Sequence, residues 1–200
     1  MTQRPDVVVV GVGRSGTTNT ARIVHEYFKV CMGHRFAIPS TALPHGGYED
    51  ERLIAKSRGL AEKHRLNAHE WIEQWEKSHN RHGCKALFKG TKQTALCNAT
   101  RDMWLSIRPE LIIRTHRPEE LVVASMLKWR SKTRGRDHWV RFVRGRENAM
   151  DTHLVDLPVP IVHVYYTKEY MEDEDLIDYL RPHIEEMKCR KLKRVGRGAT

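Results

Sequence analysis

Residues 6–18 read DVVVVGVGRSGTT, in which a run of four valines leads directly into a glycine-rich segment. A short run of β-branched residues without polar alternation is typical of a strand buried on both faces of a parallel sheet. After the glycines, Ala21, Val24 and Phe28 follow the period of an amphipathic helix. A strand, a glycine loop and a helix in this order predict the opening unit of a nucleotide-binding α/β domain, in which the backbone N–H groups of the loop face an anion.

The rest of the chain alternates strand and helix patterns in the same way. Short apolar runs predict further strands at residues 84–88, 111–114 and 160–166. Helical patterns occupy residues 49–75 and 95–107, a stretch that starts at Pro118, and residues 172–187, while 33–48 predict a long loop. This alternation predicts a single α/β domain with a central parallel sheet and helices on both faces. We expect the domain to span residues 1–187 and a basic C-terminal tail to span 188–200.

Composition limits the class of protein. The 200 residues are enough for one domain with a core, and no apolar run approaches the roughly 18 residues of a membrane span. The N-terminal apolar run passes straight into the glycine loop and has no signal-peptide cleavage site. The four cysteines, at positions 31, 84, 97 and 189, form no C-x-x-C pair, which favours reduced thiols. We therefore expect a cytoplasmic protein without membrane association or a metal, and we interpret the polar segment 79–84 as a His-rich loop.

Positive charge is concentrated in two segments of a chain whose net charge is +10. Residues 128–146 contain eight basic side chains and one acid, and residues 188–200 contain six basic side chains and no acid. Such segments indicate an anionic partner, or else a solvated helix face and a frayed tail. A basic nucleic-acid-binding module is one alternative. We do not expect it, because few aromatic residues beyond Trp129, Trp139 and Phe142 interleave the charges.

Two common interpretations of the glycine segment leave part of it unexplained. Its three glycines satisfy the dinucleotide pattern G-x-G-x-x-G, but residues 29–36 lack the acid that should bind the ribose. Gly11 and Gly16 also have the spacing of the P-loop G-x-x-x-x-G-K-[ST], and Thr18 stands at its hydroxyl position. Thr17, however, replaces the lysine that reaches the terminal phosphates of a triphosphate. A P-loop kinase-like protein therefore stays an alternative function.

The residues that are present place a guanidinium and three hydroxyls around one anion-binding loop. The segment resembles the 5′-phosphosulfate loop of the sulfotransferases, in which a basic residue precedes Ser-Gly-Thr-Thr. This resemblance implies a sulfotransferase-like domain over residues 1–187 with a fold like that of the P-loop nucleotide kinases, and 3′-phosphoadenosine 5′-phosphosulfate (PAPS) as the donor. The donor contacts that it implies are Gly13, Arg14, Ser15, Gly16, Thr17 and Thr18.

A second segment resembles the same family. Its members have a strand, then Arg and Pro, and a Ser eight residues after the Arg, and the Arg and Ser bind the 3′-phosphate of the donor. Arg117, Pro118 and Ser125 follow the expected strand at 111–114 with this spacing. The two segments occur in the family's order, and the resemblance touches most of residues 6–130. The basic tail loosely resembles a segment that some members fold over the 3′-phosphate.

Sulfuryl transfer needs cations at the departing oxygen and a base for the acceptor. We expect Arg14 and Lys89, with Lys92 as an alternative to Lys89, on the leaving-group side. Each follows an expected strand, and ligands of open α/β sheets bind at the carboxyl edge.

The base is expected in a segment that resembles a Gly-aromatic-acid segment of some relatives. Glu49 is the candidate, followed by Asp50 and then by His45, whose ordinary pKa is near neutrality. The expected reaction is an in-line transfer from PAPS, without a metal, to a hydroxyl or amine of a small-molecule or glycan acceptor.

Overall fold

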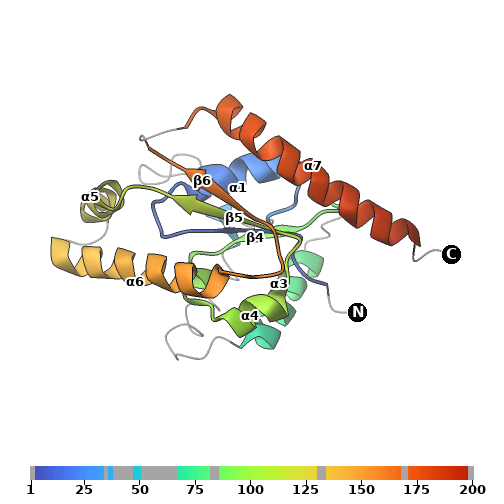
Figure 1. The fold of residues 1–200 in the computed structure, drawn as a ribbon, viewed down its shortest axis with the longest axis horizontal. Helices are drawn as coiled ribbons and strands as arrows, with labels where there is room; N and C mark the ends of the chain where they lie inside the picture. The colour runs from blue at the N-terminus through green and yellow to red at the C-terminus, as the bar shows by residue number, and fades with distance from the viewer. Residues whose placement is uncertain are drawn as a thin grey trace.

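Four parallel strands form the central sheet of the computed structural model (Figure 1). They are β1 (Val7–Val10), β4 (Gly90–Lys92), β5 (Leu111–His116) and β6 (Ile161–Tyr165), in the order β4-β1-β5-β6. The structure describes residues 3–33, 36–37, 47–50, 67–81, 86–129, 134–167 and 171–197. The expected parallel α/β architecture is confirmed, since every pairing within this sheet is parallel.

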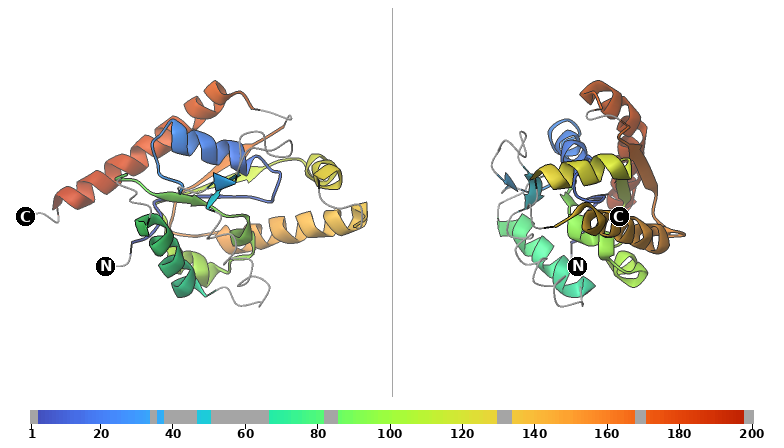
Figure 2. Two further views of the ribbon diagram at one scale, coloured as in Figure 1. Left: turned by 180° about the vertical axis from the view of Figure 1, so that it is seen from behind. Right: turned by 90° about the vertical axis from the view of Figure 1, so that its left-hand side faces the viewer.

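Helices cover both faces of this sheet (Figures 1 and 2). One face packs against α1 (Thr17–Glu26) and α7 (Asp173–Arg197), and the other packs against α3 (Ala68–Arg81), α4 (Arg101–Ile107) and α6 (Arg136–Leu154). The valine run explains this arrangement, because Val7 and Val9 enter the first core while Val8 and Val10 enter the second. Helix α5 (Glu119–Trp129) lies beyond the carboxyl end of β5.

Two elements differ from the sequence-based expectation around residues 33–75. Strands β2 (Phe36–Ala37) and β3 (Gly47–Asp50) form a small antiparallel pair, so the backbone of Glu49 belongs to a strand rather than to the start of a helix. The backbone of β3 lies beside α1 and β4. The described part of the expected helix is α3, which buries Trp71 and Trp75.

A strand was expected at residues 84–88. The described part of that range, residues 86–88, is not a strand, and the strand of this region is β4 at Gly90–Lys92. Leu87 is about half exposed, whereas all three residues of β4 are buried beside β1. The helix expected at 95–107 is divided into a 3₁₀-helix, η1 (Thr94–Asn98), and α4, which begins after Thr100. The hydroxyl of Thr100 accepts the backbone N–H of Met103 and so caps this helix.

The C-terminal basic segment is part of a helix rather than a separate tail. Helix α7 continues through Pro182 to Arg197. Lys191 bonds the carboxylate of Asp6 at 2.7 Å, and Arg194 pairs with Glu110. These contacts hold the end of α7 at the amino edge of the sheet, the opposite edge from the glycine loop, so the likeness to a segment over the 3′-phosphate is not supported.

Two further observations concern the chemistry expected from composition. Cys31 is disulfide-bonded, so the expectation of reduced thiols is wrong for this residue, while Cys97 and Cys189 are free thiols. Within the described ranges, no helix is both long and apolar enough to cross a membrane.

Candidate functional site

The glycine loop between β1 and α1 lies at the carboxyl edge of the sheet. Arg14 and Gly16 both have positive φ angles, 76° and 94°, and the N–H of Ser15 donates to the carbonyl of Val12 at 3.0 Å. This conformation leads directly into the first turn of α1, whose N-cap is Gly16. Backbone N–H groups at the start of a helix form an anion-binding site, as in P-loop proteins.

Two of the loop glycines are required by close contacts. A Cβ at Gly11 would lie 2.2 Å from the hydroxyl of Thr115 and 2.8 Å from its carbonyl oxygen. A Cβ at Gly16 would lie 2.2 Å from the ring of Tyr166. Gly13 differs, because a Cβ there would meet only a methionine methyl at 3.8 Å. The loop therefore packs against Thr115 of β5 and against Tyr166, which directly follows β6.

The three hydroxyls of the loop, all expected to contact the donor, differ in their burial and in their hydrogen-bond partners. The hydroxyl of Ser15 is fully buried and shares a hydrogen bond of 2.8 Å with that of Thr115, so it braces the loop. Thr17 is also buried. Thr18 is partly exposed, and its hydroxyl accepts a hydrogen bond of 2.8 Å from the ammonium of Lys92. Of the three hydroxyls, Thr18 is the one in direct contact with a cation.

The two segments that resemble the sulfotransferase signatures meet in space. Nε of Arg14 donates to the hydroxyl of Ser125 at 2.8 Å, across 111 positions of sequence. A guanidinium N–H of Arg117 donates to the carbonyl of Arg14 at 3.2 Å, and its buried Nε has no hydrogen-bond partner among the described residues. Strand β5 ends at His116 and α5 begins at Glu119, which brings Arg117 and Ser125 to the loop.

Lys92, and not Lys89, lies at this edge. The parallel register aligns Val9 with Lys92, so Lys92 ends β4 where β1 approaches the glycine loop. Lys89 precedes β4 and lies at the amino edge, where its ammonium donates to the side chain of Gln3 and its N–H to Asp6, both at 2.8 Å. Lys89, the expected residue, is therefore away from the glycine loop, and Lys92, its alternative, contacts Thr18 at the loop edge.

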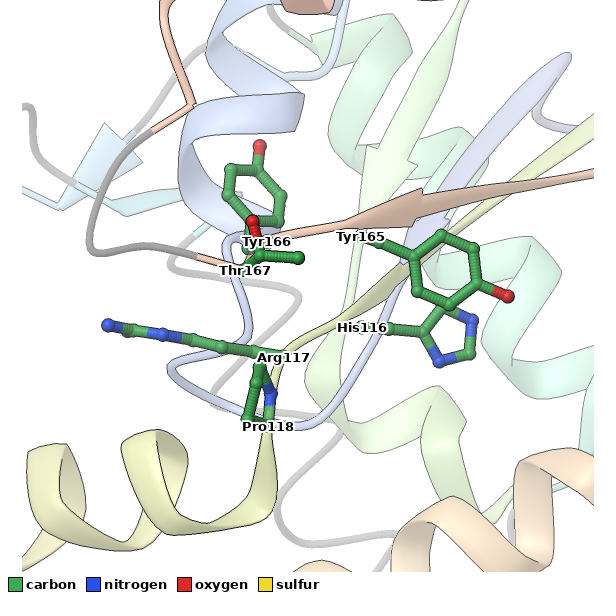
Figure 3. Close-up of a pocket in the computed structure, with 6 residues that line it drawn as sticks. All are labelled: His116, Arg117, Pro118, Tyr165, Tyr166 and Thr167. Carbon is green, nitrogen blue, oxygen red and sulfur yellow. The ribbon is translucent and has the colours of Figure 1, made fainter.

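A pocket of about 280 Å³ opens beside Arg117 (Figure 3). The ends of β5 and β6 line it, through His116, Arg117, Pro118, Tyr165, Tyr166 and Thr167. Figure 3 shows the Arg117 side chain directed away from His116 and Tyr165, and Tyr166 also lies away from these two rings. The hydroxyl of Tyr166 shares a hydrogen bond of 2.8 Å with that of Thr20, and burial raises the pKa of this tyrosine.

Three parallel rings form one wall beside this pocket. The ring of His116 stacks on that of Tyr165 at 4.7 Å and on that of His163 at 5.1 Å, and the two imidazoles share a hydrogen bond of 2.8 Å. Burial lowers the pKa of His116 to about 4, and Arg114 and His163 contribute in the same direction. His116 is therefore neutral at neutral pH, and the exposed face of Tyr165 provides a flat apolar surface.

Arg114, in β5, connects this wall to α6. Its buried guanidinium bonds the carboxylates of Glu147 and Asp151, each at 2.7 Å. Sequence reasoning missed this cluster and the stacked rings. The sequence does contain a signal for them: polar or aromatic residues stand two positions apart at Arg114 and His116 in β5, and at His163 and Tyr165 in β6. Alternate residues of a strand share one face of the sheet, so this spacing places these side chains on a common face.

The expected bases are only partly described. Glu49 and Asp50 lie in β3, whose backbone approaches α1 and β4, while the positions of their side chains lie outside the described residues, as does His45. Among the residues that the structure describes, no group of three or more His, Cys, Asp or Glu side chains is arranged to hold a metal ion.

The chain matches no protein-family profile and no curated protein. Among solved structures, it is similar to an unliganded sugar kinase from Janibacter sp. HTCC2649. The two share 16% sequence identity and align with a TM-score of 0.46 over 88% of this chain and 91% of that chain. A likeness at this level does not bear on function, which has to be argued from the site itself.

Proposed function

We propose that this protein is a sulfotransferase that moves a sulfuryl group from PAPS to a hydroxyl or amine acceptor. The observation that carries the proposal is the contact between Arg14 and Ser125, because it joins two separate phosphate-binding segments in one site. PAPS carries anionic groups at both ends of its ribose, so a protein that binds it needs two neighbouring anion sites. A single P-loop would not require the second one.

Each group of the donor has residues in the site that can bind it. The N–H groups of the glycine loop and the start of α1 receive the 5′-phosphosulfate. Arg117 and Ser125 receive the 3′-phosphate, for which the partly exposed guanidinium of Arg117 is the charged donor. The pocket beside Arg117 has room for a heterocyclic base, and the flat ring of Tyr165 offers it a stacking surface.

The chemistry follows from the cations at the carboxyl edge. Transfer breaks the bond between sulfur and the bridging oxygen of the donor, and the phosphate that departs gains negative charge. Lys92 and Arg14 are the side chains that stabilise this charge, since Arg14 belongs to the loop and Lys92 contacts Thr18 in the first turn of α1. Glu49 remains the proposed base for the acceptor proton, because β3 carries it past α1 and β4.

Calorimetry tests the donor assignment. We expect adenosine 3′,5′-bisphosphate to bind more tightly than AMP and than ATP with Mg²⁺. Arg117→Ala should weaken the bisphosphate by about 1.5–3 kcal/mol, the worth of a charged hydrogen bond, and leave AMP nearly unchanged. Arg181→Ala, an exposed arginine on α7, is the matched control. Equal losses for bisphosphate and AMP would refute the 3′-phosphate site, and tighter binding of ATP with Mg²⁺ would favour a kinase.

A further inference from the structure

The first half of α6 presents arginines to solvent. Arg134, which directly precedes the helix, and Arg136 and Arg141 within it are all exposed; we call these three the α6 arginines. Asp137 is the one acid between positions 134 and 146. Cations in the first turns of a helix oppose its dipole, so helix stability does not account for this composition. A binding role accounts for it better.

Contacts made further along α6 fix where these arginines lie. Arg144 bonds both carboxylate oxygens of Glu119, at 2.6 and 3.0 Å, two residues after Arg117. Arg146 donates to the carbonyl of Thr94, two residues after Lys92. The middle of the helix is thus tied to both phosphate-side segments of the proposed donor site.

The α6 arginines extend outward from this point. At about 1.5 Å per residue, Arg141 lies roughly 5 Å and Arg136 roughly 12 Å along the axis from Arg144. Arg136 and Arg141 are about 140° apart around the helix, so they lie on the two flanks of its exposed side. Figures 1 and 2 show this end of α6 projecting beyond the carboxyl ends of the strands, beside α5. The α6 arginines therefore begin near the proposed site and extend away from it.

We propose that the α6 arginines bind an anionic polysaccharide, carboxylated or sulfated, as the acceptor; this inference rests on the proposed function. Guanidinium groups pair with carboxylate and sulfate oxygens through two parallel hydrogen bonds. Guanidinium groups spread over the exposed side of one helix fit a polymer with repeated anions, whose sugar hydroxyls would reach the edge that carries Lys92.

The aromatic residues of this helix favour a polysaccharide over a nucleic acid. Trp139 is buried, and the ring of Phe142 is covered by the guanidinium of Arg146 at 4.2 Å. Single-stranded nucleic acids are commonly held by exposed aromatic rings on which their bases stack. In the described part of α6, neither ring is open for this purpose.

The test uses a fluorescein-labelled heparin octasaccharide and anisotropy over a range of salt concentrations, without donor. The variant R136A/R141A should bind about tenfold more weakly at physiological salt and show a shallower salt dependence. The variant R181A/K193A removes the same charge from exposed positions on α7 and should lose less than about twofold on the same electrostatic argument. Equal losses in the two variants would overturn the proposal.

Competition identifies the class of polymer. Unlabelled octasaccharide should displace the probe, whereas an acidic peptide or duplex DNA of equal charge should displace it poorly; displacement as good as that by octasaccharide would overturn the polysaccharide assignment. The bisphosphate titration is independent of these measurements. If the octasaccharide binds through α6 while the bisphosphate fails to bind, the donor function is wrong and the surface stands. If the bisphosphate binds and R136A/R141A retains full octasaccharide affinity, the surface is wrong and the donor function stands.

Discussion

The two edges of the central sheet hold their cations in different ways. At the amino edge, Lys191 bonds both oxygens of the Asp6 carboxylate, and Arg194 pairs with Glu110. At the carboxyl edge, the contacts described for Arg14, Lys92 and Arg117 are with two hydroxyls and a carbonyl. The amino-edge ion pairs join α7 to the residues that precede β1 and β5, whereas the carboxyl-edge contacts join the glycine loop and the start of α1 to β4 and α5. This comparison leads us to expect effects on stability at the first edge and effects on donor binding at the second.

The largest expected effect is on the rate of sulfuryl transfer, and it should distinguish Lys92, the last residue of β4, from Lys89, which precedes this strand. Lys92→Ala should slow sulfuryl transfer by a factor of about 10²–10³, because it removes charge stabilisation from the departing phosphate. Lys89→Ala should leave the rate almost unchanged, since its ammonium contacts Gln3 at the other edge. Release of labelled sulfate from PAPS, with and without acceptor, measures both. A slow Lys89→Ala enzyme with a normal Lys92→Ala enzyme would reverse the assignment of the edges.

A smaller effect is expected at the amino edge, on stability alone. Lys191→Met should lower the free energy of unfolding by about 2 kcal/mol, because the buried Asp6 carboxylate loses its cation. Urea denaturation measures the loss, and Lys193→Met on the same helix is the exposed control. The double variant Asp6→Asn with Lys191→Met should recover part of the stability. A fall in bisphosphate affinity beyond the loss of stability would show that this edge also serves the ligand.

The smallest effect lies in the pH dependence, where the two edges should have opposite signs. His116 has a pKa lowered to about 4, so between pH 6.5 and 4 the unfolded chain binds more protons and stability falls as the pH falls. Burial raises the pKa of Asp6 from 3.8, so its contribution is present at low pH and is lost as the pH rises through the folded-state value.

Single substitutions separate these two contributions. His116→Gln should reduce the decrease in unfolding free energy between pH 7 and pH 4 by about 1–2 kcal/mol, discounted for partial exposure. Asp6→Asn should enlarge this decrease. Urea midpoints from pH 7 to 4 provide the measurement, with the exposed His69→Gln as control. Two variants with shifts of the same sign would contradict the contrast between the edges.

The sequence predicted those parts of the fold that local pattern determines. The valine run became β1, and the apolar runs before Arg117 and Thr167 became β5 and β6. Strand β4 escaped detection because Gly-Thr-Lys is not a strand-like sequence. Its burial comes from β1 on one side and from Trp75 and Met32, which pack against Gly90, and tertiary context of this kind overrides local propensity.

The end of α7 could not be predicted for a related reason. Residues 188–197 carry charge and little apolar periodicity, which is the pattern of a solvated tail. Their helical order is supported by ion pairs to Asp6 and Glu110, which lie 185 and 84 positions away from their partners. Pairing over such separations leaves no local signal in the sequence.

The candidate site was predictable where two motifs had a fixed spacing. Arg14, Arg117 and Ser125 were expected together and are in contact. Lys92 was placed second to Lys89 only because the strand register was unknown. The stacked rings of His116, His163 and Tyr165 depend on the pairing of β5 with β6, which the sequence does not specify.

The contact between Gly16 and Tyr166 has a consequence for the order in which the protein folds. The loop is encoded near the N-terminus, whereas the ring that packs on it follows β6, 150 positions later. A growing chain emerges with the loop sequence complete but without the ring or the Thr115 hydroxyl that brace it. The loop therefore acquires its final support only after the last strand has joined the sheet, and a chain truncated before residue 160 would carry the motif without the means to hold its shape.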